Sequence, residues 1–379
     1  MRILGESLAR LRATRTSVKW RFFEPEVLPV WVAEMDARPC PEVVEVVTTA
    51  LHTGDTGYAW AAPYAAAFAG FSRRRWGWAP DPATMMLLPD VMIGIEEILH
   101  VLPGDAVVVS PPCYDSFHGF VASVRKRAVL APLGLDHRLD AEALERAFIE
   151  AGPGAAYLLC NPHNPTGTVN TPDELAMLAA LADRHGIQVI SDEIHAPLTA
   201  PGATFTPYLQ VPGAERGIAV VSASKSWNLA GLKAALAVPG PEASVLDELH
   251  EVVTHGANHV AVLAQTAAYA HGDVWLDRVN AEIAENRALL VDLLVRELPQ
   301  VAVAPAEATY LAWLDCRALG LPGVGRDDPA AHFLEHGRVA LASGLRYDPV
   351  GGAGWARFNL GTSPEVITEA VRRMVTAVR

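Results

Sequence analysis

IAVVSASKSWNLAGLK, residues 218–233, contains two of the four lysines of a chain that has twenty-six arginines. Its first four residues are apolar and mostly β-branched, and polar residues follow from Ser222, which is typical of a buried strand that ends near residue 222. Lys225 follows this strand directly. An amine at that position suggests chemistry that a permanently protonated guanidinium cannot perform, such as the formation of a Schiff base.

Similar apolar runs alternate with helical segments between about residues 84 and 238. This alternation predicts an α/β fold in which a mostly parallel sheet has helices on both faces. A helix is expected from Pro172 to about residue 185, because Thr171 and Glu174 form a capping box and Gly186 follows the last turn. The runs that read as strands are AVVVS (106–110), AYLLC (156–160), IQVIS (187–191) and IAVVS (218–222).

The C-terminal third has a different pattern. A long helical stretch covers residues 273–298, a short strand is expected at 310–315, and a closing helix begins after Pro364. We therefore predict a larger domain at residues 46–250 and a smaller α+β domain at 251–379, joined by an N-terminal segment, residues 1–45.

Composition excludes several classes of protein. The net charge of −13 argues against nucleic acid as the main partner. No apolar run approaches the length of a membrane span, and the N-terminus lacks the features of a signal peptide. The four cysteines are widely spaced without a C-x-x-C pair, which argues against a disulfide framework or a zinc site. We expect a cytoplasmic protein that binds neither metal, membrane nor nucleic acid.

Turns that follow the predicted strands carry the candidate chemistry, because open α/β sheets bind ligands beyond the carboxyl ends of their strands. Together they supply an aromatic ring, an amide, a carboxylate and an amine. A lysine paired with a carboxylate that faces a pyridine nitrogen is the pattern of pyridoxal phosphate sites. Hydroxyls and a lysine cation can hold the phosphate. The turns are PPCYDSF (111–117), NPHNPTG (161–167), SDEIH (191–195) and SASKS (222–226).

In their order along the chain, these motifs resemble those of fold-type I pyridoxal-phosphate enzymes, the aspartate aminotransferase superfamily of class I and II. Within it, they are most similar to the MalY/PatB group of cystathionine β-lyases. The resemblance covers nearly the whole chain. It rests on LPVWVAEMDARPCP (28–41), GDTGYAW (54–60), PPCYDSF, CNPHNPTGTV (160–169), SDEIH, SASKSWNLAGLK (222–233), GDVWLDRV (272–279), EATYLAWLDCRALGL (307–321) and RFNL (357–360).

This resemblance implies pyridoxal 5'-phosphate as the cofactor and an aspartate-aminotransferase-like fold. It implies that Lys225 carries the cofactor as a Schiff base and moves the proton at the substrate Cα. Asp192 should pair with the pyridine nitrogen, and Tyr114 should stack on the ring. Asn164 should donate to the ring's phenolic oxygen, and His195 should lie near the ring.

Other positions should bind the phosphate or the substrate. The resemblance assigns the phosphate to Ser222, Ser224, Lys233 and the backbone at Val91 and Met92. Arg357 should clamp the substrate α-carboxylate, with Asn164 nearby. Tyr58 should reach the phosphate and substrate of a neighbouring subunit, which implies a homodimer with active sites at the subunit interface.

Two positions depart from the pattern of the family. Asp90 stands where the family usually has a glycine before the phosphate-binding helix, and its carboxylate could cap the amides that a phosphate would use. Lys233 stands where many members of the superfamily have arginine and many of this group have glutamine. Both departures point to a specialised member.

We interpret the sequence as that of a C–S lyase that acts on cystathionine, cysteine or a cysteine S-conjugate and releases a thiol, pyruvate and ammonia. An aminotransferase would use the same lysine, aspartate and arginine. A C–S lyase or oxidative deaminase for a bulky conjugate in natural-product biosynthesis is a further alternative, and so is a regulatory protein on the same fold.

Overall fold

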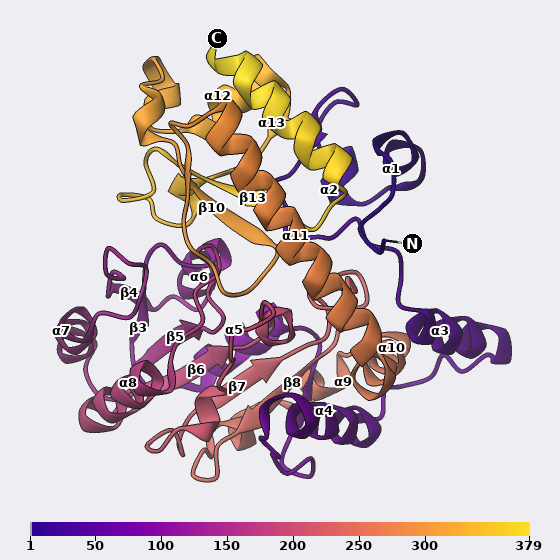
Figure 1. Ribbon diagram of the computed structural model, residues 1–379. Coiled ribbons are helices and arrows are strands. Elements are labelled where there is room, and N and C mark those ends of the chain that lie inside the picture. The colour runs from indigo at the N-terminus through magenta and orange to yellow at the C-terminus, as the bar shows by residue number, and fades with distance from the viewer. Residues whose placement is uncertain (1) are drawn as a thin grey trace.

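A mostly parallel sheet forms the centre of the larger part of the molecule in the computed structural model, which describes residues 2–379 (Figure 1). The strand order is β2-β8-β7-β6-β5-β3-β4. Strands β4, β3, β5, β6 and β7 run parallel, whereas β8 is antiparallel to both of its neighbours. The strands are β2 (Met86–Leu88), β3 (Ala106–Val109), β4 (Arg127–Leu130), β5 (Ala156–Cys160), β6 (Gln188–Asp192), β7 (Ile218–Val221) and β8 (Ala235–Pro239).

The central strands are buried on both faces, as the continuous apolar runs predict. Alternate residues of β3 point into different cores: Val107 and Val109 belong to one apolar cluster, and Ala106 and Val108 to another. This double burial leaves the carboxyl ends of the strands as the place where polar side chains can reach a ligand.

Helices cover this sheet and the region beside it (Figure 1). The capping box of α8 is formed as predicted, with Thr171 and Glu174 each bonding the other's backbone and Gly186 in the left-handed conformation. The helices are α3 (Pro41–Thr53), α4 (Ala61–Trp76), α5 (Val91–Val101), α6 (Asp115–Ser123), α7 (Ala141–Ala151), α8 (Pro172–His185), α9 (Glu251–His255) and α10 (His259–His271).

The rest of the chain forms a smaller unit above the large sheet in Figure 1. Its antiparallel sheet has the order β12-β13-β10-β9. Helix α11 runs from the large sheet to this unit (Figure 1). The elements are α11 (Asp273–Glu297), β9 (Ala302–Val303), β10 (Leu311–Asp315), α12 (Pro329–Gly337), β11 (Val339–Ala340), β12 (Ala342–Ser343), β13 (Trp355–Asn359) and α13 (Pro364–Val378).

The N-terminal segment packs beside this smaller unit. It contains α1 (Leu8–Thr14), α2 (Val18–Arg21) and β1 (Leu28–Pro29), and β1 pairs in parallel with β11. Short 3₁₀ turns complete the fold at Ala196–Leu198, Tyr208–Gln210, Val245–Glu248, Arg317–Leu319, Gly323–Arg326 and Gly344–Arg346.

The predicted fold class is confirmed, and the four predicted strands are present with ends that differ by one residue at most. The strand predicted at 187–191 is β6 (Gln188–Asp192), so Asp192 closes the strand instead of following it. The domain boundaries near residues 45 and 250 stay predictions. Among residues 2–379, none of the helices combines the length and the hydropathy that a membrane span requires.

Candidate active site

A cavity lies at the carboxyl edge of the large sheet. Much of its lining comes from turns that follow strands, since parallel strands end at the same edge. We call this space the inner cavity. Ten of the residues predicted for the site line it: Val91, Met92, Tyr114, Asn164, Asp192, His195, Ser222, Ser224, Lys225 and Lys233.

Lys225 lies just beyond β7, and its ammonium donates to the backbone oxygen of Ala33 at 3.0 Å. Burial, aided by the positive charge of Arg357, lowers the pKa of this amine to about 8, although the negative charge of Asp192 opposes the shift. A substantial fraction of the amine is therefore neutral slightly above neutral pH, which is the form that can attack a carbonyl.

Asp192 is the last residue of β6 and accepts a hydrogen bond from the backbone N–H of Ile194 at 3.1 Å. Burial raises the pKa of this carboxyl to about 6, and the Ile194 N–H and the charge of Lys225 oppose the rise. The carboxylate is thus mostly ionised at neutral pH. A buried negative charge of this kind favours protonation of a pyridine nitrogen placed against it.

His195 is buried near these two groups. Burial lowers the pKa of its imidazole well below the usual value, and the charges of Lys225 and Arg357 add to this effect, so the ring is neutral. Its Nδ1 has no hydrogen-bond partner among residues 2–379. Because buried polar atoms are rarely left unpaired, this nitrogen is suited to pair with a polar atom of a ligand in the cavity.

Arg357 lies on β13, in the smaller sheet, and reaches the large sheet across a second cavity. Its guanidinium donates to Asn164 Oδ1 and to the backbone oxygen of Trp31, both at 2.9 Å. It also lies over the ring of Tyr347, 4.8 Å from the ring centroid. All three partners are neutral. A carboxylate in this cavity would supply the opposite charge in the bidentate geometry that arginine favours.

This second space is called the substrate cavity below. It shares Ala33, Tyr114 and Lys225 with the inner cavity, so the two adjoin at the lysine. Tyr114 is the residue before α6, and its ring packs edge-on against Phe117.

The end of the inner cavity near α5 carries the two departures noted in the sequence. Lys233 Nζ lies 2.6 Å from Asp90 Oδ2, and the other oxygen of Asp90 caps the helix by accepting from Ile93 N at 2.8 Å. The Ser222 hydroxyl donates to Ala234 O or Gln265 Oε1, at 2.8 and 3.0 Å. The cation expected to meet a phosphate is therefore already paired with a carboxylate.

Tyr58 lies apart from the other predicted residues. It stands between α3 and α4, is 96% exposed, and lines neither cavity. Its neighbour Trp60 is 71% exposed. This position places the ring on the surface of the subunit.

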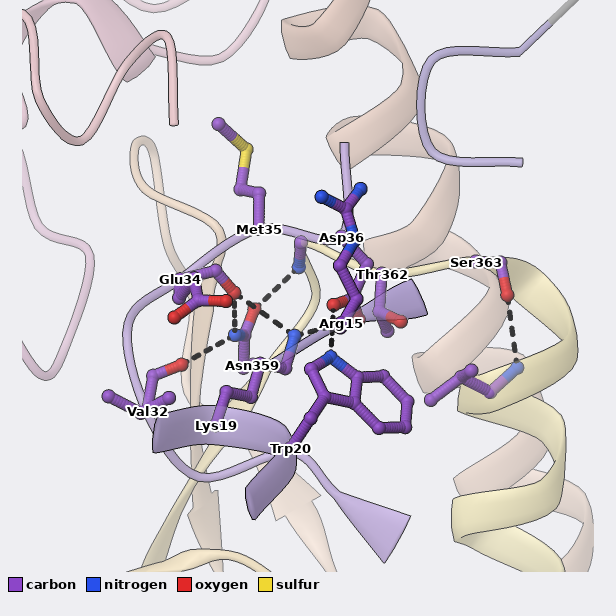
Figure 2. Close-up of polar contacts among 12 residues, drawn as sticks. Arg15, Lys19, Trp20, Val32, Glu34, Met35, Asp36, Asn359, Thr362 and Ser363 are labelled. Atoms are coloured by element: carbon purple, nitrogen blue, oxygen red, sulfur yellow. Dashed lines mark hydrogen bonds and ion pairs between the residues drawn. The ribbon is translucent and has the colours of Figure 1, made fainter. Parts of the chain in front are cut away.

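The segment from Trp31 to Asp36 contributes more to the site than its motif indicated (Figure 2). Asn359 donates to the backbone oxygens of Val32 and Glu34, at 2.6 and 2.7 Å. Asp36 pairs with Lys19 at 2.7 Å, and both side chains are almost completely buried. These contacts hold the Ala33 oxygen against Lys225. The sequence resemblance included the segment without giving it a role, because backbone acceptors leave no residue-type signal.

Sequence comparison identifies the family. Residues 89–374 match the family described as aminotransferase class I and II. The chain belongs to this family. Within residues 2–379 of this aminotransferase-family protein, no group of three or more His, Cys, Asp or Glu side chains could hold a metal ion.

Relatives of the aminotransferase-family chain extend over its whole length. It is 46% identical to a protein of Mycobacterium tuberculosis (strain CDC 1551 / Oshkosh) described as "Putative cystathionine beta-lyase", over 97% of this chain and 96% of that protein. It is 33% identical to cystathionine beta-lyase PatB of Bacillus subtilis (strain 168), over 96% of each chain. The crystal structure of the PLP-bound C–S lyase from Staphylococcus hominis superposes with a TM-score of 0.89 at 25% identity, covering 97% of both chains.

Enzymes of this family use pyridoxal phosphate, and the residues of the inner cavity suit that group. Lys225 supplies a buried amine of lowered pKa, Asp192 a buried carboxylate, and His195 an unpaired ring nitrogen. These are the groups that an aldehyde, a pyridine nitrogen and a polar ring substituent require. The fit is less complete at the end of the cavity near α5, where the phosphate would bind, because Lys233 there already forms an ion pair with Asp90.

Proposed function

We propose that this protein is a pyridoxal-phosphate-dependent C–S lyase that cleaves cystathionine, cysteine or a cysteine S-conjugate to a thiol, pyruvate and ammonia. One observation carries most of the weight: Lys225 lies where the inner cavity meets the substrate cavity, between Asp192 and Arg357. The likeness to PatB of Bacillus subtilis supports elimination as the reaction.

Bound pyridoxal phosphate supplies an aromatic ring that accepts electrons from the substrate Cα. Lys225, Asp192, Asn164 and His195 would hold its ring, with Tyr114 against one face. Ser222, Ser224, Lys233 and the backbone at Val91 and Met92 would hold its phosphate. The protein itself contributes orientation and proton transfer.

Each residue has a task that follows from its place. Arg357 binds the α-carboxylate of the amino acid and so fixes which bond at Cα faces Lys225. The Lys225 amine, neutral near its lowered pKa, removes the Cα proton. Asp192 would keep a negative charge beside the pyridine nitrogen of the bound cofactor. The C–S bond then breaks at Cβ, and the sulfur leaves as a thiolate.

The distinguishing experiment uses purified holoenzyme and cystathionine. We expect thiol and pyruvate in equal amounts without a 2-oxoacid acceptor. A strict need for such an acceptor, with no thiol released, would show an aminotransferase instead. Lys225→Ala should abolish turnover and covalent cofactor attachment, whereas retained turnover would contradict the assignment.

We further infer that the active unit is a homodimer whose sites lie at the subunit interface. The support is the exposed segment between α3 and α4, where Tyr58 and Trp60 present large rings to the surface. A second copy that covers this segment would bring Tyr58 to the site that the resemblance assigns to it.

A further inference from the structure

An ion pair stands on the wall of the substrate cavity, apart from the residues assigned so far. Arg346 donates to Asp115 Oδ2 at 2.7 Å, and both side chains line the cavity together with Lys225 and Arg357. The Asp115 side chain is 20% exposed and that of Arg346 is 54% exposed. One cavity thus contains a clamp for an α-carboxylate and, separately, one charge of each sign.

The fold fixes this pair relative to the clamp. Asp115 is the first residue of α6 and follows Tyr114, whereas Arg346 ends a 3₁₀ turn and precedes Tyr347, which lies against Arg357. The two segments are joined by a backbone hydrogen bond from Cys113 to Tyr347, at 2.9 Å. The backbone segments that carry the two charges are therefore tied to each other beside the substrate cavity.

A bound substrate changes the energetics of the pair. In water, a partly exposed ion pair contributes little free energy, because solvent hydrates both charges. A substrate side chain that fills the cavity removes part of this water. An uncharged side chain would leave the two groups less well solvated, whereas a side chain with its own ammonium and carboxylate would replace the lost hydrogen bonds.

We propose that Asp115 and Arg346 form a specificity subsite for a second amino-acid group at the far end of the substrate. Arg346 binds the distal carboxylate, and Asp115 binds the distal ammonium. The preferred substrates are cysteine thioethers whose leaving thiol is itself an amino acid. This assignment rests on the proposed lyase function and adds no chemical step to it.

The test compares two substrates in Arg346→Gln and Asp115→Asn variants. With cystathionine, which carries the distal group, kcat/KM should fall about tenfold, equal to about 1.4 kcal/mol, with most of the change in KM. With S-ethylcysteine, which lacks it, kcat/KM should stay within about twofold of wild type. An equal loss with both substrates, or no loss with either, would overturn the subsite.

A matched control and a binding measurement complete the design. Arg317 and Asp315 form a similar pair, at 2.6 Å with side chains 62% and 24% exposed, that lines neither cavity. Arg317→Gln should leave both substrates unaffected. Calorimetry with diaminosuberate, in which a methylene replaces the sulfur of cystathionine, should show binding to wild-type holoenzyme that weakens about tenfold in Arg346→Gln.

The two hypotheses fail separately. If the wild-type enzyme cleaves neither thioether, the lyase function is wrong, and the diaminosuberate titration still decides whether the subsite binds a distal amino-acid group. If S-ethylcysteine is cleaved and diaminosuberate binds equally to wild type and Arg346→Gln, the lyase function stands and the subsite does not.

Discussion

Lys225 owes its reactivity to where it is buried. Its pKa is lowered to about 8, chiefly by burial, although Asp192 counteracts the shift. The other lysines are held differently: Lys19 and Lys233 pair with carboxylates, and Lys126 donates to the backbone oxygens of Leu102 and Gly104. Burial also lowers the pKa of Lys126, but this lysine lines neither cavity, whereas Lys225 lines both.

This shift predicts how cofactor uptake depends on pH. The neutral amine attacks the aldehyde, so the rate at which cofactor-free protein binds pyridoxal phosphate covalently should rise with pH through a midpoint near the pKa of about 8. Stopped-flow absorbance would record the rate. Lys225→Ala is the control, since it should bind the cofactor only non-covalently. A rate that does not change between about pH 6 and 10 would contradict the prediction.

A second prediction concerns Asp90, at the end of the inner cavity near α5. Asp90→Asn keeps the hydrogen bond that caps the helix but removes the negative charge that pairs with Lys233. We expect cofactor affinity to increase several-fold, on the order of 1 kcal/mol, because the pair is partly exposed. Fluorescence titration of cofactor-free protein would measure Kd.

Lys233→Gln provides the opposing control for this experiment. If Lys233 serves the phosphate, its loss should weaken cofactor binding in the Asp90→Asn background. Unchanged affinity in both variants would mean that the ion pair only stabilises the fold.

At the scale of elements, the segment from Trp31 to Asp36 depends on a buried ion pair. Asp36 accepts from Lys19 at 2.7 Å and from Trp20 Nε1 at 2.8 Å (Figure 2). Removing one partner of such a pair leaves an unmatched charge in a dry environment. The backbone oxygen of Ala33, in this segment, accepts a hydrogen bond from Lys225, so the ion pair also helps to hold a contact of the active site in place.

We therefore predict that Asp36→Asn lowers the free energy of unfolding by about 3 kcal/mol. Denaturant titration of the cofactor-free protein would measure the change. Glu26→Gln removes one partner of an exposed pair with Arg338, at 2.6 Å, and should change the free energy by less than about 0.5 kcal/mol. Similar values for the two variants would show that Lys19 finds another partner or is hydrated.

The strands and helices with strong local signals were predictable. The capping box that begins α8 and the buried runs of β3, β5 and β7 depend on neighbours in the chain. Strands β1 and β11 have only two residues each, too few for any periodicity. They exist because they pair with each other across the chain.

On the scale of the whole molecule, the proposed dimer makes a sharp prediction about subunit exchange. If Tyr58 acts in the neighbouring subunit, Lys225→Ala and Tyr58→Phe are each defective alone but complement each other in a mixed dimer. One of the two sites then has both native residues. Random mixing should restore about a quarter of the wild-type activity if both parents are inactive.

Light scattering should give a mass of about twice the chain mass of 40.6 kDa. A mixture of Lys225→Ala with Asp192→Asn is the control, because both residues line one cavity of one chain and the mixed dimer regains no complete site. Absence of complementation by the Tyr58 variant, in a protein that exchanges subunits, would place Tyr58 outside the site.

The sequence alone determined the α/β class and which turns carry chemistry, because strand periodicity, helix caps and residue types are local properties. Tertiary structure decided which groups meet. Lys225 reaches Ala33 across 192 positions, Arg357 reaches Asn164 across 193, and Lys233 reaches Asp90 across 143. Such contacts arise when the strand ends converge at one edge of the sheet and the N-terminal segment packs over it, and no local pattern specifies that arrangement.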